Sequence, residues 1–212
     1  MPRTHEGLVR LIGRHGVTDP RVIEAFRRVP RRDYVPPDSQ HLAYGDRPVG
    51  LPLGQTTSQP SLIARMIEAA APRSSDRALE VGTGYGFQTA LLSHLVAEVV
   101  SIERLRELAE AATENLRRAG INGVEVRHGD GFAGAFDRAP FNVIVVSAAA
   151  PQVPGALVDQ LADGGRLVIP VWDEAASSDN VVSITKRDGA PLPARLITPA
   201  RFVPLVPGPA ED

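Results

Sequence analysis

The sequence predicts an α/β fold built on an open, doubly wound and mostly parallel sheet. Two observations carry this expectation. Apolar strand patterns alternate with helical patterns, with strands near residues 77–82, 98–103, 123–128, 141–147 and 165–171 and helices near 86–97, 104–119 and 153–162. Such alternation gives parallel strands joined by right-handed crossovers. In addition, the continuous apolar run 143–146 is typical of a central strand covered on both faces.

The residues before this alternation predict helices and one long irregular segment. Helices are expected at 6–15 and 20–29, the second capped by Asp19 with Pro20 at its first position. Residues 30–59 are rich in Pro, Gly and Asp and show little periodicity. They are too long for an ordinary connection, which favours a functional loop. A further helix at 60–71 then leads into the first strand of the sheet.

The last part of the chain predicts a change of strand direction. Segments 180–187 and 194–205 read as strands, and no helix long enough for a crossover separates them, so at least one should be antiparallel. We therefore expect residues 1–59 to form N-terminal helices and a loop within the same domain as a Rossmann-like core at 60–207. A short tail, 208–212, follows.

Composition limits the possible functions. The chain of 212 residues has a net charge of −2, which does not favour a nucleic acid or an anionic membrane as partner. It has no cysteine, which excludes disulfides and thiolate zinc sites, and its five histidines show no metal-ligand spacing. No signal-peptide pattern or long apolar run is present, so we expect a cytoplasmic, monomeric protein without a metal. Basic residues near 27–32 are expected on a solvated helix end.

The most informative motif is Leu-Glu-Val-Gly-Thr-Gly-Tyr-Gly at 79–86. Glycines at 82, 84 and 86 allow a tight turn and a close approach of backbone N–H groups to a ligand. The next strand ends in Glu103, 21 residues after Gly82, where a carboxylate can accept both hydroxyls of a ribose. Together these features indicate a nucleoside cofactor.

The glycine spacing does not match the dinucleotide fingerprint, because the third glycine comes one residue early. With Glu80 in the strand, it resembles the S-adenosylmethionine loop of class I methyltransferases. That resemblance implies a loop against the methionine part of the cofactor and Glu103 on its ribose. The loop residues concerned are Glu80, Gly82, Thr83, Gly84, Tyr85 and Gly86. Asp130 and Gly131 follow the strand at 123–128, where they can reach the adenine edge. Alternatively, Glu103 caps the next helix and Asp130 stabilises a turn.

Further segments narrow the resemblance to one family. They are Gly-Gln-Thr-Thr-Ser-Gln-Pro at 54–60, Ala-Ala-Ala-Pro-Gln-Val-Pro at 148–154 and Arg-Phe-Val-Pro-Leu at 201–205, with lead-in segments 29–36 and 43–48. Together with the glycine loop they resemble protein-L-isoaspartate O-methyltransferases, from about residue 7 to 208. The resemblance implies methylation, by S-adenosylmethionine, of the free carboxylate of L-isoaspartyl residues in damaged proteins and peptides. The ester then collapses to a succinimide, which permits repair.

The resemblance also implies the site residues. Ser58 is expected to be the active-site residue, and the peptide substrate is expected to contact Thr56, Thr57, Ser58, Gln59, Pro60, Ala149, Val203, Pro204 and Leu205. A main-chain-like carboxylate has a pKa of roughly 3.5, so it is already an anion at neutral pH and needs no general base. Ser58 would orient it by a hydrogen bond. The alternative is that Ser58 or Gln59 only caps the helix beginning at Pro60.

Some residues depart from the family pattern. Thr57 replaces the usual isoleucine, Ser61 stands where a larger ring is common, and Tyr85 replaces a small residue of the glycine loop. Asn142 replaces an aspartate, which we expect to remove a charge near the cofactor edge. Two other functions therefore stay open. One is an aspartate O-methyltransferase that acts on a dedicated biosynthetic peptide. The other is a non-catalytic module that binds peptides or adenosine compounds.

Overall fold

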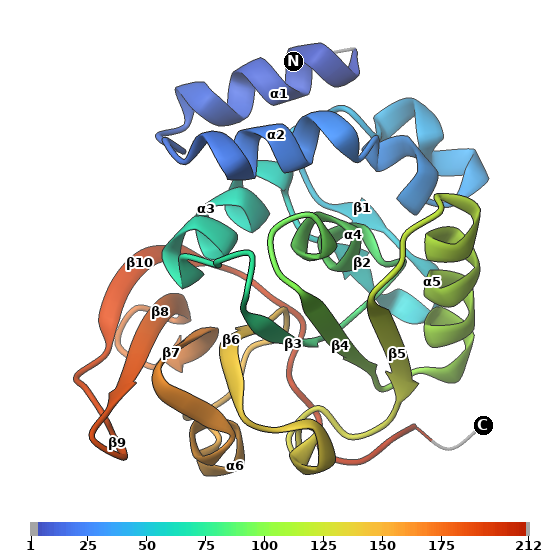
Figure 1. The fold of residues 1–212 in the computed structure, drawn as a ribbon. Helices are drawn as coiled ribbons and strands as arrows, with labels where there is room; N and C mark the ends of the chain where they lie inside the picture. Colours follow the sequence, from blue (N-terminus) through green and yellow to red (C-terminus); the bar gives the residue numbers. More distant parts are fainter. Residues whose placement is uncertain (1–3, 211–212) are drawn as a thin grey trace.

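The computed structural model describes residues 4–210 and contains one large sheet and a small two-stranded one (Figure 1). The large sheet has the strand order β10-β8-β7-β6-β3-β4-β5, with β9 beside β8. Its strands are β3 (Arg77–Val81), β4 (Glu98–Glu103), β5 (Val124–His128), β6 (Phe141–Val146), β7 (Leu161–Asp173), β8 (Ser178–Arg187), β9 (Ala190–Pro191) and β10 (Arg195–Ala200). Strands β3 to β7 are parallel, and β8 is antiparallel to both neighbours. The predicted fold class is confirmed.

The helices cover the two faces of the sheet unequally. They are α1 (His5–Arg14), α2 (Pro20–Arg28), α3 (Pro60–Ala70), α4 (Phe87–Ser93), α5 (Arg106–Arg118) and α6 (Gly155–Asp159). Figure 1 shows α1 and α2 side by side above α3 and α4, and these four share one apolar core with the sheet. The opposite face buries Leu79, Ile144 and Leu167 in a second core, to which α6 contributes Leu157.

Two predicted helices are shorter than expected. Helix α4 ends at Ser93, but the next turn still buries Leu95 and Val96, so the apolar spacing continued beyond the helix. The helix expected at 153–162 is only the short α6, because β7 already begins at Leu161, where it pairs with Phe141. Apolar spacing reports burial, and it does not distinguish the end of a helix from a buried turn.

The strand predicted at 194–205 is also too long. Strand β10 ends at Ala200, and the chain then leaves the edge of the sheet and crosses to Ala149. There Ala149 N–H donates to the Val203 carbonyl at 2.8 Å, and Leu205 N–H donates to the Ala149 carbonyl at 2.7 Å. The segment 201–205 therefore lies beside the residues that follow β6. The last residues of the predicted tail, 211–212, lie outside the described residues.

The long loop after α2 is ordered around a buried arginine. It contains η1 (Arg31–Tyr34), η2 (Pro37–Leu42), η3 (Pro52–Gly54) and a small antiparallel pair, β1 (Val49–Gly50) and β2 (Thr56–Thr57); a fourth short helix, η4 (Phe136–Arg138), lies elsewhere. The Arg31 guanidinium donates to the carbonyls of residues 43, 45, 47 and 58 and to the Thr57 hydroxyl. The prediction that Arg31 belongs to a solvated helix end is wrong, since its exposed fraction is 0%.

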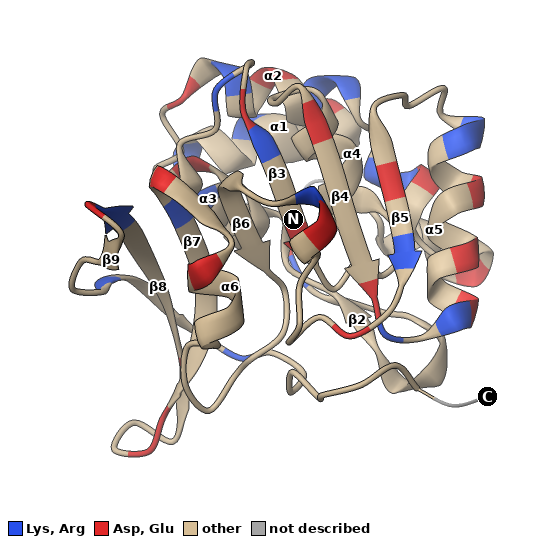
Figure 2. Cartoon of the chain, turned by 60° about the horizontal axis from the view of Figure 1, so that its bottom comes forward, with Lys and Arg blue, Asp and Glu red and all other residues tan. Residues whose placement is uncertain are grey.

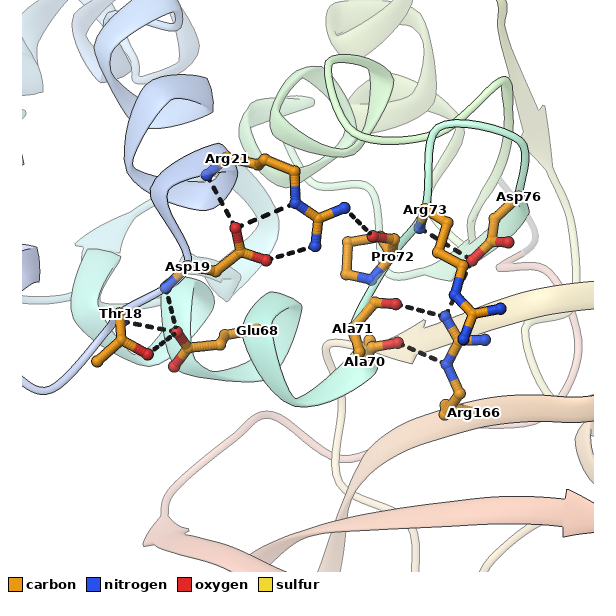
Figure 3. A network of polar contacts seen from close by, with 10 residues as sticks. All are labelled: Thr18, Asp19, Arg21, Glu68, Ala70, Ala71, Pro72, Arg73, Asp76 and Arg166. Carbon is orange, nitrogen blue, oxygen red and sulfur yellow. Dashed lines mark hydrogen bonds and ion pairs between the residues drawn. The ribbon is translucent and has the colours of Figure 1, made fainter.

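Polar contacts outside the core fix α3 against α2 and β7 (Figure 3). The Glu68 carboxylate of α3 accepts from the N–H groups of Thr18 and Asp19 at 2.6 and 2.7 Å. Beyond the C-terminal end of α3, Arg166 of β7 donates to the Asp76 carboxylate at 2.9 Å and to the Ala70 carbonyl at 2.8 Å. These contacts matter for the site because α3 begins at Pro60, the last residue of the segment 54–60.

Candidate active site

The candidate ligand site lies at the carboxyl ends of the central strands. It is a cavity of about 280 Å³, whose walls include Val81 to Tyr85 after β3, Ile102 to Leu105 after β4, and Ser147 and Ala148 after β6. Between β3 and β6 the strand order reverses, and such a reversal opens a crevice in an α/β sheet. Residues 54–58 and 203–206 complete the wall.

Close backbone approach explains two of the glycines in this wall. Gly84 has φ +56°, and a Cβ there would lie 3.3 Å from Cδ1 of Leu51. Gly131 faces the end of β3 so closely that a Cβ would stand 2.3 Å from Cγ1 of Val81. Any larger side chain at either position would fill the cavity or displace its wall.

Glu103 presents a buried carboxylate at the end of β4. One oxygen accepts from Gly84 N–H at 2.8 Å and the other from Leu105 N–H at 3.1 Å. Burial raises the pKa of this carboxyl, against the backbone hydrogen bonds that lower it. Helix α5 begins at Arg106, so the hydrogen bond from Leu105 N–H lies at the residue just before the helix. Each carboxylate oxygen can accept two hydrogen bonds, so acceptor capacity remains for a hydroxyl donor in the cavity.

Glu80 lies beneath the glycine loop and does not line the cavity. It is fully buried in β3, where it accepts hydrogen bonds from Gln88 at 3.0 Å, from Ser101 at 2.6 Å and from Thr89. Burial raises its pKa to about 7, although these hydrogen bonds favour the ionised form. The position indicates that Glu80 supports residues of the cavity wall, without a direct ligand contact. Gly86 also lies outside the wall, against Leu116 and Ala112 of α5.

The segment after β5 contributes one of its two predicted residues. Gly131 lines the cavity, whereas the Asp130 carboxylate accepts from Phe132 N–H at 2.8 Å and closes a turn. Asp130 is half-buried and stands beside the wall. Tyr85 does line the cavity, and burial raises its pKa. Asn142 is far from this edge, because its amide oxygen accepts from Arg77 N–H where β3 and β6 begin. The expected effect of Asn142 on the cofactor edge is therefore wrong.

A second cavity, of about 390 Å³, meets the first beside Ser58. The two share Thr56, Ser58, Ser147 and Val203, and the second extends along α3 and the end of β10 to Arg65 and Phe202. Gln59 lines the second cavity, and Thr57, Pro204 and Leu205 line the first. Pro60 is buried at the start of α3. Ala149 forms a β-bridge with Pro204. The predicted substrate residues are thus brought together around one junction.

The Ser58 side chain is free to bind a ligand. Its carbonyl accepts from Arg31 at 3.1 Å, but no group within residues 4–210 forms a hydrogen bond with its hydroxyl. The expected alternative, that Ser58 or Gln59 caps α3, is wrong. The first free N–H of α3, that of Ser61, donates instead to the Asp46 carboxylate at 2.9 Å. The other oxygen of Asp46 accepts from the Gln59 amide at 3.0 Å.

Several residues at the site were not predicted from the sequence, among them Arg31, Asp46, Gln88 and Ser147. Arg31 and Asp46 lie within the lead-in segments that resemble the family, but nothing local distinguishes them from surface charges. Within the described part of the chain there is no group of three residues that could hold a metal ion. The same part contains no helix with the length and apolar character needed to cross a membrane.

Comparison with known proteins places the chain in one family. The family model described as protein-L-isoaspartate(D-aspartate) O-methyltransferase (PCMT) matches residues 3–210. A protein-L-isoaspartate O-methyltransferase of Methanoculleus marisnigri is 47% identical over 188 residues, which cover 88% of this chain and 84% of that protein. The enzyme of the same name from Aeromonas hydrophila is 42% identical, over 92% of this chain and 93% of that protein.

Solved structures agree with this assignment. A protein-L-isoaspartate O-methyltransferase superimposes with a TM-score of 0.84 at 29% identity, over 95% of this chain; the chain spans 65% of that protein's length. A putative enzyme of this type from Plasmodium falciparum, in complex with S-adenosyl-L-homocysteine, gives a TM-score of 0.82 at 25% identity, with 97% of this chain and 99% of that one covered. The chain therefore belongs to the protein-L-isoaspartate(D-aspartate) O-methyltransferase family.

Proposed function

We propose that this protein uses S-adenosylmethionine to methylate the free carboxylate of L-isoaspartyl residues in damaged proteins and peptides. The observation that carries the proposal is the position of Ser58. Its unengaged hydroxyl lies at the junction of two cavities, one suited to a nucleoside cofactor and one open along α3 and β10. A methyl donor in the first cavity and a peptide in the second would meet at this junction.

The groups that line the first cavity suit S-adenosylmethionine in their chemistry. Glu103 offers hydrogen-bond acceptors for the two ribose hydroxyls, and the glycine loop leaves room for the ligand beside the backbone. The apolar side chains of Leu51, Val81 and Ile102 offer surfaces for the adenosine part. When bound, S-adenosylmethionine would supply a methyl group carried on a positively charged sulfur. A carboxylate oxygen of the substrate would bond to that methyl carbon as the carbon–sulfur bond breaks, which gives a methyl ester and S-adenosylhomocysteine.

The protein's own residues would act by alignment. The substrate carboxylate is already ionised at neutral pH, since its pKa is roughly 3.5, so no general base is needed. Ser58 would donate a hydrogen bond to one carboxylate oxygen and so direct the other toward the methyl group. Such a charge-assisted bond contributes about 1.5–3 kcal/mol. Holding both reactants in line and away from water supplies most of the remaining acceleration, on the order of 7–11 kcal/mol.

The test is methyl transfer from radiolabelled S-adenosylmethionine to paired synthetic peptides, one with L-isoaspartate and one with aspartate. We expect base-labile label on the isoaspartyl peptide only. Ser58→Ala should lower kcat/KM by about tenfold to a hundredfold, as the lost hydrogen bond predicts. Its affinity for S-adenosylhomocysteine, measured by calorimetry, should stay unchanged.

Ser93→Ala serves as the matched control. Ser93 lies at the end of α4, donates to the Ala90 carbonyl at 2.8 Å and lines neither cavity, so its loss should not change turnover. Cofactor binding without label on either peptide would contradict the repair function and favour a dedicated peptide substrate. Absence of cofactor binding would favour a non-catalytic binding module.

We further infer that the protein acts as a cytoplasmic monomer on polypeptides. Basic and acidic positions both occur along α5 and along the N-terminal helices, so neither element is basic throughout (Figure 2). Such mixed charge does not favour a nucleic acid as partner. Sedimentation of the purified protein would test the monomeric state.

A further inference from the structure

The side-chain amide of Gln88 is only half satisfied. Gln88 is the second residue of α4, is 5% exposed and lines the first cavity. Its amide nitrogen donates to Glu80 Oε1 and to Ser147 Oγ, both at 3.0 Å. Its amide oxygen is buried and accepts no hydrogen bond from any described residue. Buried polar atoms in folded proteins nearly always have a hydrogen-bond partner, so we expect this oxygen to accept a hydrogen bond from a bound ligand.

The orientation of the amide is fixed by its neighbours. When Glu80 is ionised it can only accept hydrogen bonds, so the Gln88 nitrogen then faces it. Rotating the amide by half a turn would place the Gln88 oxygen against the Glu80 oxygen. Glu80 is itself held by Thr89 and Ser101, which both donate to its other oxygen. The acceptor that remains free on Gln88 is therefore a consequence of the surrounding structure.

Gln88 lies at one end of the cavity. Gln88 contacts Ser147, which follows β6, whereas Glu103 ends β4, and β3 lies between these two strands. Hydroxyl-binding acceptors at Glu103 and a second acceptor at Gln88 thus stand on opposite sides of β3. Ser147 lines both cavities, but Gln88 lines only the first. The partner of Gln88 should therefore belong to the cofactor and not to the peptide.

We propose that Oε1 of Gln88 accepts a hydrogen bond from the α-ammonium group of S-adenosylmethionine, and that Glu80 and Ser147 position it to do so. This inference rests on the proposed cofactor and on its ribose lying at Glu103. An ammonium group has three N–H donors and no acceptor, which matches a site that offers only an acceptor. The buried Glu80 carboxylate behind the amide adds attraction for a cation. With its amino-acid end beside Ser147, the cofactor would carry its methyl group near Ser58.

The test compares two ligands that differ only in the amino group. Calorimetry would measure the affinity of S-adenosylhomocysteine and of its desamino analogue for the wild type and for Gln88→Leu. We expect Gln88→Leu to weaken the binding of S-adenosylhomocysteine at least tenfold. The binding of the desamino analogue should weaken less than threefold. Gln88→Met, with an unbranched side chain of similar length, repeats the comparison if the leucine variant does not fold.

Thr89→Val is the matched control. Thr89 also donates to Glu80, but it is fully buried and lines neither cavity. Its replacement leaves the Gln88 acceptor and both partners of the Gln88 nitrogen in place, so the difference in weakening between the two ligands should be much smaller than for Gln88→Leu.

Two results would overturn the inference alone. One is that Gln88→Leu and Gln88→Met weaken the binding of both ligands by the same factor, which would indicate a purely structural role for Gln88. The other is unchanged binding of both ligands with a raised KM for the isoaspartyl peptide, which would assign the acceptor to the substrate. Failure of the wild type to bind S-adenosylhomocysteine would instead overturn the proposed function, and this inference with it.

Discussion

Buried charged side chains surround the candidate site, and each is held by a different kind of partner. Arg31 donates mainly to backbone carbonyls and lies 5.9 Å from the centre of the Phe87 ring. Burial lowers its pKa to about 10, so it remains a cation at neutral pH. Glu80 has only neutral donors, and Glu103 has backbone N–H groups. These residues order the loop and the floor of the cavity, and removing any one would leave buried partners unsatisfied.

The raised pKa of Glu80 predicts a pH-dependent stability difference. The folded pKa, about 7, lies above the unfolded value near 4.5, so the ionised form destabilises the folded state relative to a neutral group. This cost is absent below about pH 4.5, grows as the pH rises to about 7 and is then constant. The unfolding free energy of Glu80→Gln, relative to wild type, should therefore rise across this range. Urea titrations between pH 4.5 and 8 would measure it.

The sign and the range of this effect make it testable. A difference between Glu80→Gln and the wild type that does not change with pH would show that Glu80 titrates normally in the folded protein. Ser101→Ala provides a comparison, because it removes a donor to the Glu80 carboxylate without removing the charge. It should raise the Glu80 pKa further and move the same transition to higher pH.

At the scale of the elements, the start of α3 determines where Ser58 stands. Ser58 and Gln59 immediately precede this helix, and the Asp46 carboxylate holds its first turn by accepting from Ser61 N–H and from the Gln59 amide. A carboxylate at a helix N-terminus also interacts favourably with the helix dipole. The loop that contains Asp46 is in turn fixed by Arg31. The position of Ser58 thus depends on contacts between the loop and the helix.

Replacing this cap should affect both stability and catalysis. We expect Asp46→Ala to lower the unfolding free energy by about 1 kcal/mol, as the loss of a helix cap does. It should also lower kcat/KM for an isoaspartyl peptide by about tenfold, because a small displacement of Ser58 misaligns the reactants. Denaturant unfolding and the methyl-transfer assay measure the two effects.

Asp19→Ala is the matched control for this prediction. Asp19 caps α2 by accepting from Arg21 N–H at 2.8 Å and lines neither cavity. It should lower stability by about 1 kcal/mol but leave kcat/KM unchanged. If both variants lose activity in proportion to stability, Asp46 has no specific role in placing Ser58.

At the scale of the whole molecule, the two cavities differ in charge. The first is lined by both Glu103 and Arg104, whereas the described residues that line the second include His15, Arg65 and Arg201 and no Asp or Glu. Arg65 is fixed by bonds to the Ile197 carbonyl and the Thr198 hydroxyl, and Arg201 is exposed. A peptide that enters along α3 and β10 would therefore meet a positive surface before it reaches Ser58.

This charge predicts a preference among substrates. Isoaspartyl peptides with acidic flanking residues should have a lower KM than the same peptides with lysine, by about twofold to fivefold, since exposed ion pairs contribute about 0.2–1 kcal/mol. The difference should shrink as salt is added. Arg201→Gln should reduce it, whereas Arg187→Gln, an exposed change outside both cavities, should not. Equal KM values for the two peptides at low salt would contradict the prediction.

The sequence by itself determined the parallel sheet, the glycine turn after β3 and the candidate roles of Glu103 and Ser58. These depend on local periodicity and on short motifs, in which neighbouring residues define the structure. Tertiary structure alone decided the burial of Arg31, the capping of α3 by Asp46 and the free acceptor of Gln88. The partners of these residues lie far away in the chain or on other elements. A polar side chain has the same local pattern whether it is solvated or buried, so only the packing around it reveals its role.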